Sequence, residues 1–150
     1  MLGVVRGLVC GGWKMIVGVT GHDVPEQVGA FERALQSGTW NTDVRGFALY
    51  EGGLHTPDAD LPFKMDHAGA WETSCMMYVC PQSVDLDELR QRGLCTAEET
   101  VMAGAEGIGG KNPLKYASAE LGRKIVERMG DLIGGRAVQR LEDERRARKA

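Results

Sequence analysis

The sequence predicts an α/β fold built around parallel strands. Two apolar segments of strand length, 14–20 and 44–50, flank a segment, 24–35, in which apolar residues recur at helical spacing. Nearly continuous apolar runs are typical of strands that are covered on both faces, as in parallel sheets. Strand, helix and strand together span about 37 residues, which is the size of a βαβ unit. We therefore expect a parallel sheet with helices packed against it.

The helix of this unit has recognisable ends. Pro25 follows the first strand closely, and proline suits the first turn of a helix because its nitrogen needs no hydrogen-bond acceptor there. Ser37 and Gly38 end the apolar stripe, and glycine is the usual residue after a helix C-terminus. These signals place the helix at about residues 25–38.

The middle of the chain contains a long loop and two shorter helices. Residues 51–66 are rich in Gly, Pro and Asp, and a loop of this length in a compact domain is often functional. We interpret His55 in this loop as a surface histidine, with substrate contact as the alternative. Residues 73–79 predict a helix that Pro81 terminates, and 86–91 predict a short helix.

The last part of the chain predicts a helix and a charged tail. The pair Asn112-Pro113 is a typical helix start, and a stripe of apolar residues continues from 114 to 132. We expect Gly134 and Gly135 to interrupt this helix. The domain organisation is then an α/β domain over 1–135 and a charged C-terminal helix or tail over 136–150.

Composition excludes several classes of function. The 150 residues hold 18 Lys and Arg against 21 Asp and Glu, so the formal charge is −3 and gives no electrostatic basis for binding nucleic acid or an anionic membrane. There is no apolar run of membrane-spanning length and no secretory signal pattern, so we expect a cytoplasmic protein. The cysteines form no C-x-x-C pair, which indicates reduced thiols.

The first candidate site is the segment Thr20-Gly21-His22-Asp23, which directly follows a predicted strand. Ligands of open parallel sheets bind beyond the carboxyl ends of the strands, and imidazole is a common ligand of divalent transition metals. His22 is therefore a candidate metal ligand, with a hydrogen-bonded loop histidine as the alternative. Asp23 is either an oxygen ligand or a residue that starts the helix.

The second candidate site lies in the segment from Asp66 to Ser74, which reads Asp-His-Ala-Gly-Ala-Trp-Glu-Thr-Ser. The small residues between His67 and Glu72 allow both side chains to reach one pocket. His67 can transfer protons near neutral pH, and Glu72 can bind a metal, accept a proton or stabilise a helix dipole. Trp71 is either a core or interface residue or a platform for substrate.

Taken together, these segments resemble the creatininase (creatinine amidohydrolase) family. Its members carry a similar His-Ala-Gly-x-x-Glu-Thr-Ser run that leads into an apolar helix. Two further segments agree in the same order along the chain, and the resemblance extends over about residues 11–135. The matching segments are 13–22, 66–74 with the following 76–78 and 81–86, and 107–122.

The resemblance implies a three-layer α/β/α fold with a mainly parallel sheet, in a homo-oligomer. It also implies a pair of divalent metals, Zn or Mn, that activate water to open a cyclic amide such as creatinine. Relatives act on other substrates, including inosose-type cyclic ketones. The expected partner is therefore a small-molecule substrate, with no nucleic acid and no membrane.

Matching positions assign roles to individual residues. By resemblance, His22 is a metal ligand, and His67 is a catalytic residue that delivers a proton to the departing nitrogen. Glu72 is either a metal ligand or a catalytic support for His67. Substrate binding is assigned to Asp66, Trp71 and Asp23.

The chain also departs from the family pattern. The family's first metal-binding segment, Gly-x-x-Glu-x-His-Gly followed by Asp, does not precede the strand at 14–20. Some members place a metal-binding Glu where this chain has Val24. We therefore expect at most one metal, an incomplete sheet, and a chain that corresponds to the C-terminal portion of the family. A degenerate, non-catalytic binding or oligomerisation module and a self-sufficient hydrolase with a single metal are the alternatives.

Overall fold

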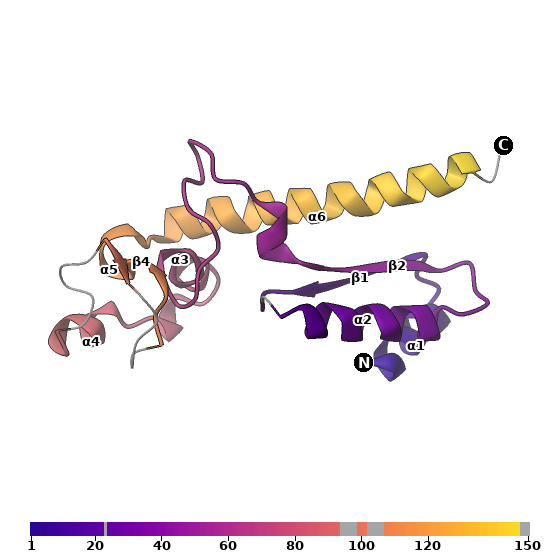
Figure 1. Ribbon diagram of the computed structural model, residues 1–150, viewed down its shortest axis with the longest axis horizontal. Helices are drawn as coiled ribbons and strands as arrows, with labels where there is room; N and C mark the ends of the chain where they lie inside the picture. Colours follow the sequence, from indigo (N-terminus) through magenta and orange to yellow (C-terminus); the bar gives the residue numbers. More distant parts are fainter. Residues whose placement is uncertain (23, 94–98, 102–106, 148–150) are drawn as a thin grey trace. The chain divides into compact units, whose positions relative to one another are not determined.

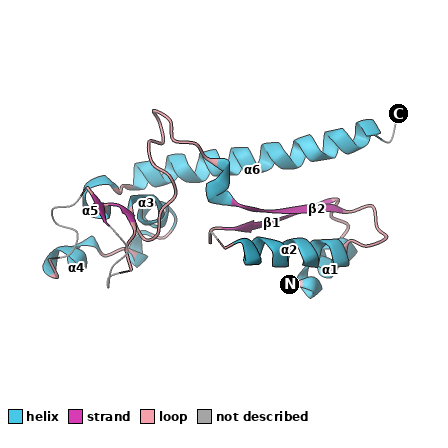
Figure 2. Cartoon of the chain, viewed as in Figure 1, coloured by secondary structure: helices cyan, strands magenta, loops and turns pink. Residues whose placement is uncertain are grey.

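A computed structural model describes residues 1–22, 24–93, 99–101 and 107–147 (Figure 1). Helices dominate, and the strands are short (Figure 2). The chain divides into two compact units: the first comprises residues 1–54 and 132–150, and the second comprises 55–131. Among the described helices, none combines the length and the apolar character needed to cross a membrane.

The first unit contains the predicted βαβ arrangement. Strands β1 and β2 pair in parallel, from Met15 opposite Arg45 to Thr20 opposite Tyr50. Each strand begins one residue later than predicted and ends where predicted, and the intervening helix has the predicted bounds. The elements of this unit, apart from the end of α6, are α1 (Leu2–Cys10), β1 (Met15–Thr20), α2 (Pro25–Gly38), β2 (Arg45–Tyr50) and the short 3-10 helix η1 (Glu51–Leu54).

One face of the parallel sheet packs on α2. Ile16 and Leu35 are 7% and 4% exposed and belong to the core of this unit. Gly46 allows the close approach of Leu35, because a Cβ at this position would lie 2.8 Å from the Leu35 Cδ2 atom. Helix α1, which was not predicted from the sequence, packs on α2 through Val5, which occupies the space beside Gly38.

The other face of the sheet carries the C-terminal part of α6. The Arg140 guanidinium lies 5.2 Å from the centre of the Phe47 ring, and Arg45 Nε lies 2.6 Å from Glu144 Oε2. In Figure 1, α2 and the end of α6 lie on opposite sides of the two strands. The unit is thus a small parallel sheet between helices, which confirms an α/β fold that is incomplete relative to the family.

The second unit is mainly helical, with short strands β3 and β4 paired antiparallel. Leu61, Trp71 and Ile125 are among its most buried side chains, each at most 2% exposed. Its elements, apart from α6, are α3 (Ala70–Val79), the 3-10 helix η2 (Pro81–Ser83), α4 (Leu86–Gln91), β3 (Thr100–Val101), β4 (Gly110–Lys111) and α5 (Pro113–Tyr116).

Two predicted helix boundaries in this unit are wrong. Helix α3 begins at Ala70 rather than Thr73, because the Asp66 carboxylate accepts hydrogen bonds from N–H groups of its first turn. The helix that begins at Pro113 with Asn112 as N-cap ends at Tyr116 instead of continuing to 132. Ala117 is extended, so a new helix starts after it.

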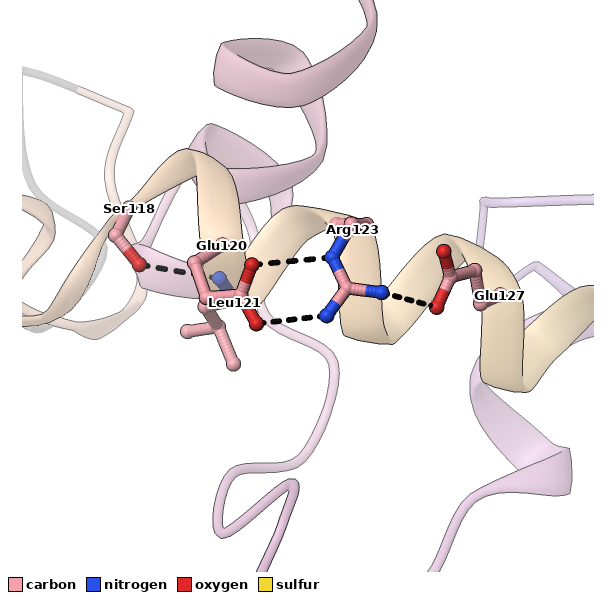
Figure 3. A network of polar contacts seen from close by, with 5 residues as sticks. All are labelled: Ser118, Glu120, Leu121, Arg123 and Glu127. Atoms are coloured by element: carbon pink, nitrogen blue, oxygen red, sulfur yellow. Dashed lines mark hydrogen bonds and ion pairs between the residues drawn. The ribbon is translucent and has the colours of Figure 1, made fainter.

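This new helix, α6 (Ala119–Ala147), runs without a break across the boundary between the units. Ser118 Oγ accepts the N–H of Leu121, and Arg123 pairs with both Glu120 and Glu127 at the start of the helix (Figure 3). The expected interruption at Gly134 and Gly135 is wrong. Each glycine costs only about 1 kcal/mol relative to alanine, and the surrounding residues are good helix formers.

Candidate functional site

His22 lies in a turn that hydrogen bonds hold at the end of β1. Its N–H donates to Thr20 Oγ1 at 3.0 Å, and its carbonyl oxygen accepts the N–H of Val24 at 2.8 Å. Thr20 is only 5% exposed, and its hydroxyl lies 3.1 Å from Gln27 Oε1 on α2. The buried threonine therefore fixes the turn while the His22 side chain is exposed. Asp23, predicted to bind substrate or metal, lies outside the described residues.

Asp66 organises the second candidate segment. Its Oδ2 accepts the N–H of Trp71 at 3.1 Å, and its Oδ1 accepts the N–H of Glu72 at 3.3 Å. Burial raises the pKa of the Asp66 carboxyl group, and the hydrogen bonds from backbone N–H groups oppose this shift. The contacts of Asp66 are thus those of a helix cap, and its role in substrate binding stays a prediction.

Two glycines make room for the Asp66 carboxyl group. A Cβ at Gly69 would lie 2.3 Å from Asp66 Oδ2, and a Cβ at Gly110 would lie 2.2 Å from Asp66 Cβ. Gly110 also has a φ of 146°, which residues with a side chain rarely adopt. Any side chain at either position would therefore displace the carboxylate from the start of α3.

His67 is held by its backbone and presents an exposed side chain. It forms an antiparallel bridge with Gly109, with N–H to carbonyl distances of 2.8 and 2.7 Å in the two directions. The next residue, Ala68, has a φ of 52°, in the left-handed region. The imidazole is thus mounted on a fixed turn rather than on a free loop.

Glu72 reaches back from the first turn of α3 to this same turn. Its Oε2 accepts the N–H of Ala68 at 2.7 Å, and Thr73 Oγ1 donates to the Ala68 carbonyl oxygen at 3.3 Å. The Glu72 contact resembles one half of a capping box, in which a side chain of the first helical turn accepts a backbone N–H that precedes the helix. The Glu72 carboxylate therefore supports Ala68, the residue that directly follows His67. Of the roles expected for Glu72, this contact fits the support of His67.

Trp71 and His55 pack together in the second unit. Trp71 is 2% exposed, as expected for a core residue. The His55 ring lies 5.1 Å from the Trp71 ring, and His55 Nε2 donates a hydrogen bond to the Leu61 carbonyl oxygen at 2.9 Å. His55 is thus half-buried against the tryptophan and keeps partial exposure, and its contact with substrate stays a prediction.

A hollow of about 330 Å³ opens beside this segment. Its polar side chains are those of Glu72, Thr73, Ser83 and Asp85, and apolar residues of α3, α4 and neighbouring segments form most of the rest. This feature was not predicted from the sequence, because no local pattern brings the two helices together. The apolar positions of 73–79 and 86–91 were its only signal.

The described residues contain no group of three His, Cys, Asp or Glu side chains that can hold a metal ion. His22 belongs to the first unit, whereas His67 and Glu72 belong to the second. Their meeting in one cavity, and the metal-ligand roles of His22 and Glu72, therefore stay predictions.

Comparison with known proteins identifies the family. The family model for creatininase, described as creatinine amidohydrolase, matches residues 1–134. No curated protein and no solved structure gives a significant match. The matched region includes both candidate segments and all but the last 16 of the 150 residues. The chain therefore belongs to the creatininase family of hydrolases.

Proposed function

We propose that the chain takes part in the ring-opening hydrolysis of a cyclic amide such as creatinine, with His67 as the proton donor to the departing nitrogen. The observation that carries this proposal is the geometry of the turn between Asp66 and Glu72. Backbone bonds to Gly109 and the Glu72 carboxylate hold the residues around His67, and the imidazole itself is exposed. The family match over residues 1–134 supports a hydrolase.

The proposed reaction requires a proton donor when the ring nitrogen departs. Water adds its oxygen to the carbonyl carbon of the ring amide, and the bond between that carbon and the ring nitrogen then breaks. The departing nitrogen takes up a proton as this bond breaks, and His67 delivers it from its protonated ring. An imidazole suits this step because its ordinary pKa lies near neutral pH. The attacking water releases one proton as it adds, and this proton replaces the one that His67 delivers, so the imidazole returns to its protonated form.

Glu72 acts in this proposal as a positioning residue. Its carboxylate holds the N–H of Ala68, the residue that directly follows His67, at 2.7 Å. The creatininase family is generally metal-dependent, and the resemblance implies Zn or Mn. Among the described residues, no three suitable donor side chains lie together. The proposal is therefore limited to proton transfer by the His67 side chain.

The test compares two alanine variants of exposed residues in the same loop. His67→Ala lowers kcat for ring opening by about 10²- to 10⁴-fold, the usual contribution of a general acid. Lys64→Ala, three residues earlier, retains wild-type activity. Added imidazole restores part of the rate of His67→Ala, because it supplies the missing proton donor. A His67→Ala variant with an unchanged kcat would refute the role.

A second candidate function is a non-catalytic binding or oligomerisation module. The observation in its favour is that the carboxylates of Asp66 and Glu72 are both engaged by backbone N–H groups. Metal analysis of the purified protein and an activity screen on cyclic amides separate the two candidates. Less than one tightly bound metal per chain, together with no turnover, supports the module; turnover that depends on His67 supports the hydrolase.

A further inference from the structure

The hollow beside Glu72 has the size and lining of a small-molecule site. Its volume of about 330 Å³ lies within the range of known ligand pockets. Helix α3 contributes one wall, and the segment from η2 to α4 contributes another. Its apolar side chains are Met76, Val84, Leu86, Leu89 and Ile108.

The charged groups on this lining are both acidic. Glu72 uses Oε2 to accept the N–H of Ala68, and Asp85 uses Oδ1 to accept the N–H groups of Asp87 and Glu88. Each carboxylate therefore has one oxygen tied to backbone. Among the described residues that line the hollow there is no Lys or Arg. The lining thus combines an apolar surface with two carboxylates, and no cationic side chain is among its described residues.

A cation attached to an aliphatic chain is complementary to this lining. The aliphatic part gains from contact with the apolar wall, and the positive group gains from the nearby carboxylates. Neutral polar molecules lack the second gain, and small inorganic cations lack the first. Anions are repelled.

We propose that this hollow binds the cationic, aliphatic arm of a ligand, a guanidinium or ammonium group on a chain of several carbons. Glu72 contacts the positive group, and Met76 and Leu89 contact the chain. The identification of this ligand as a substrate rests on the proposed function. In that case the natural substrate is larger than an unsubstituted ring and is selected through the wall formed by α3 and α4.

Binding of three probes to the full chain tests the proposal by calorimetry. Butylguanidinium carries both features, butylurea is a neutral molecule of similar shape, and methylguanidinium keeps the charge but lacks the chain. Butylguanidinium binds at least 10-fold more tightly than either of the other probes. Each methylene group of the chain contributes about three- to fourfold, as expected for burial in an apolar site.

Two lysine substitutions on α3 provide matched variants. Met76 and Tyr78 are similarly exposed, at 40% and 42%, but only Met76 lines the hollow. Met76→Lys adds a positive charge to the site and weakens butylguanidinium binding at least 10-fold, whereas Tyr78→Lys changes it less than twofold. Glu72→Gln keeps an acceptor for the N–H of Ala68 and weakens butylguanidinium binding without changing that of butylurea.

Several outcomes overturn the proposal. Equal affinity for butylurea and butylguanidinium removes the role of charge, and equal effects of the two lysine variants remove the role of this hollow. Binding that is lost as the protein self-associates assigns the surface to a second copy of the chain. The binding assay needs no turnover, so it separates the two proposals. Turnover without butylguanidinium binding refutes only the ligand class, and binding without turnover refutes only the hydrolase.

Discussion

At Gly122, α6 lies directly against the backbone of α3, and replacing this glycine with alanine tests the packing of the second unit. Gly122 is buried in the first turns of α6. A Cβ at this position would lie 1.9 Å from the Ser74 carbonyl oxygen and 2.4 Å from the Ser74 carbonyl carbon. These are backbone atoms of α3, so no side-chain rotation relieves the clash, and the two helices must separate in Gly122→Ala.

The cost follows from the distances. A real Cβ essentially never lies closer than 3.0 Å to such an atom, so the helices must withdraw by about 1 Å. Overpacking of this kind costs about 1–3 kcal/mol. The separation also strains the hydrogen bond from the Ser118 N–H to Ser74 Oγ, now 3.0 Å, which is worth about 1 kcal/mol. The higher helix propensity of alanine offsets about 1 kcal/mol, so the free energy of unfolding falls by about 1–3 kcal/mol.

Gly130→Ala is the matched control, because Gly130 lies on the same helix in the same unit and a Cβ added there would meet no atom within 4 Å. It raises the free energy of unfolding by about 0.5–1 kcal/mol through helix propensity alone. Urea unfolding followed by circular dichroism at 222 nm measures both variants. If Gly122→Ala is as stable as Gly130→Ala, the close contact with Ser74 does not exist, and the packing described for α3 and α6 is wrong.

Three further predictions concern the cap, the ion pair and the sheet. Asp66→Ala removes the acceptor at the start of α3 and lowers the free energy of unfolding by about 0.5–2 kcal/mol in urea titrations; an unchanged value contradicts the cap. The Arg128 guanidinium, together with hydrogen bonds from the N–H groups of Leu61 and Asp60, lowers the pKa of Asp58 from 3.8 to about 2, so these contacts stabilise the fold above pH 4 and this contribution is lost as the pH falls through about 2. Carboxyl NMR of Arg128→Ala shows the Asp58 pKa return toward its ordinary value, and an unchanged pKa refutes the pairing. The described sheet of the first unit has two strands with open edges and an exposed Trp40 nearby in the sequence, so light scattering detects oligomers, whereas a stable monomer contradicts this expectation.

The βαβ unit could be predicted closely from the sequence because its signals are local. The strands are apolar runs bounded by polar residues, and the helix has a proline at its start and a glycine at its end. The sheet between helices then follows from general packing rules. Helix α1 was missed because it is short, apolar and mostly exposed, without a polar face that marks a helix period.

The start of α3 could not be predicted, because the residue that caps it, Asp66, does not occupy the N-cap position directly before the helix. Asp66 lies four residues before Ala70, and it reaches the helix only because Gly69 and Gly110 leave space for its carboxyl group. Gly110 belongs to a distant strand, so the arrangement depends on tertiary structure. The predicted interruption at Gly134 and Gly135 is wrong for the opposite reason. It relied on a local signal, the pair of glycines, but each glycine destabilises a helix by only about 1 kcal/mol, and α6 continues through both.

In the candidate site too, the sequence indicates which residues matter but not which contacts they make. The sequence singled out His67 and Glu72 by type and spacing, but not the hydrogen bond from the Ala68 N–H to Glu72. Ala68, which donates this bond, has a φ of 52°. A conformation of this kind is uncommon for a residue with a side chain, and three supporting groups maintain it. These are the bridge between His67 and Gly109, the Glu72 carboxylate and the Thr73 hydroxyl.

These hydrogen bonds hold the backbone next to His67 in place without a metal ion, which suits the proposed role of His67 as a proton donor. Glu72→Gln should leave the turn nearly intact, because the amide oxygen of glutamine accepts the Ala68 N–H as the carboxylate does, whereas Glu72→Ala removes the acceptor. If Glu72 only supports His67, the glutamine variant retains most of the ring-opening activity and the alanine variant loses it. If Glu72 is a metal ligand, both variants lose activity and bound metal together, because a neutral amide is a poor substitute for a carboxylate. Activity and metal content of the two variants therefore decide between the two roles that the sequence left open.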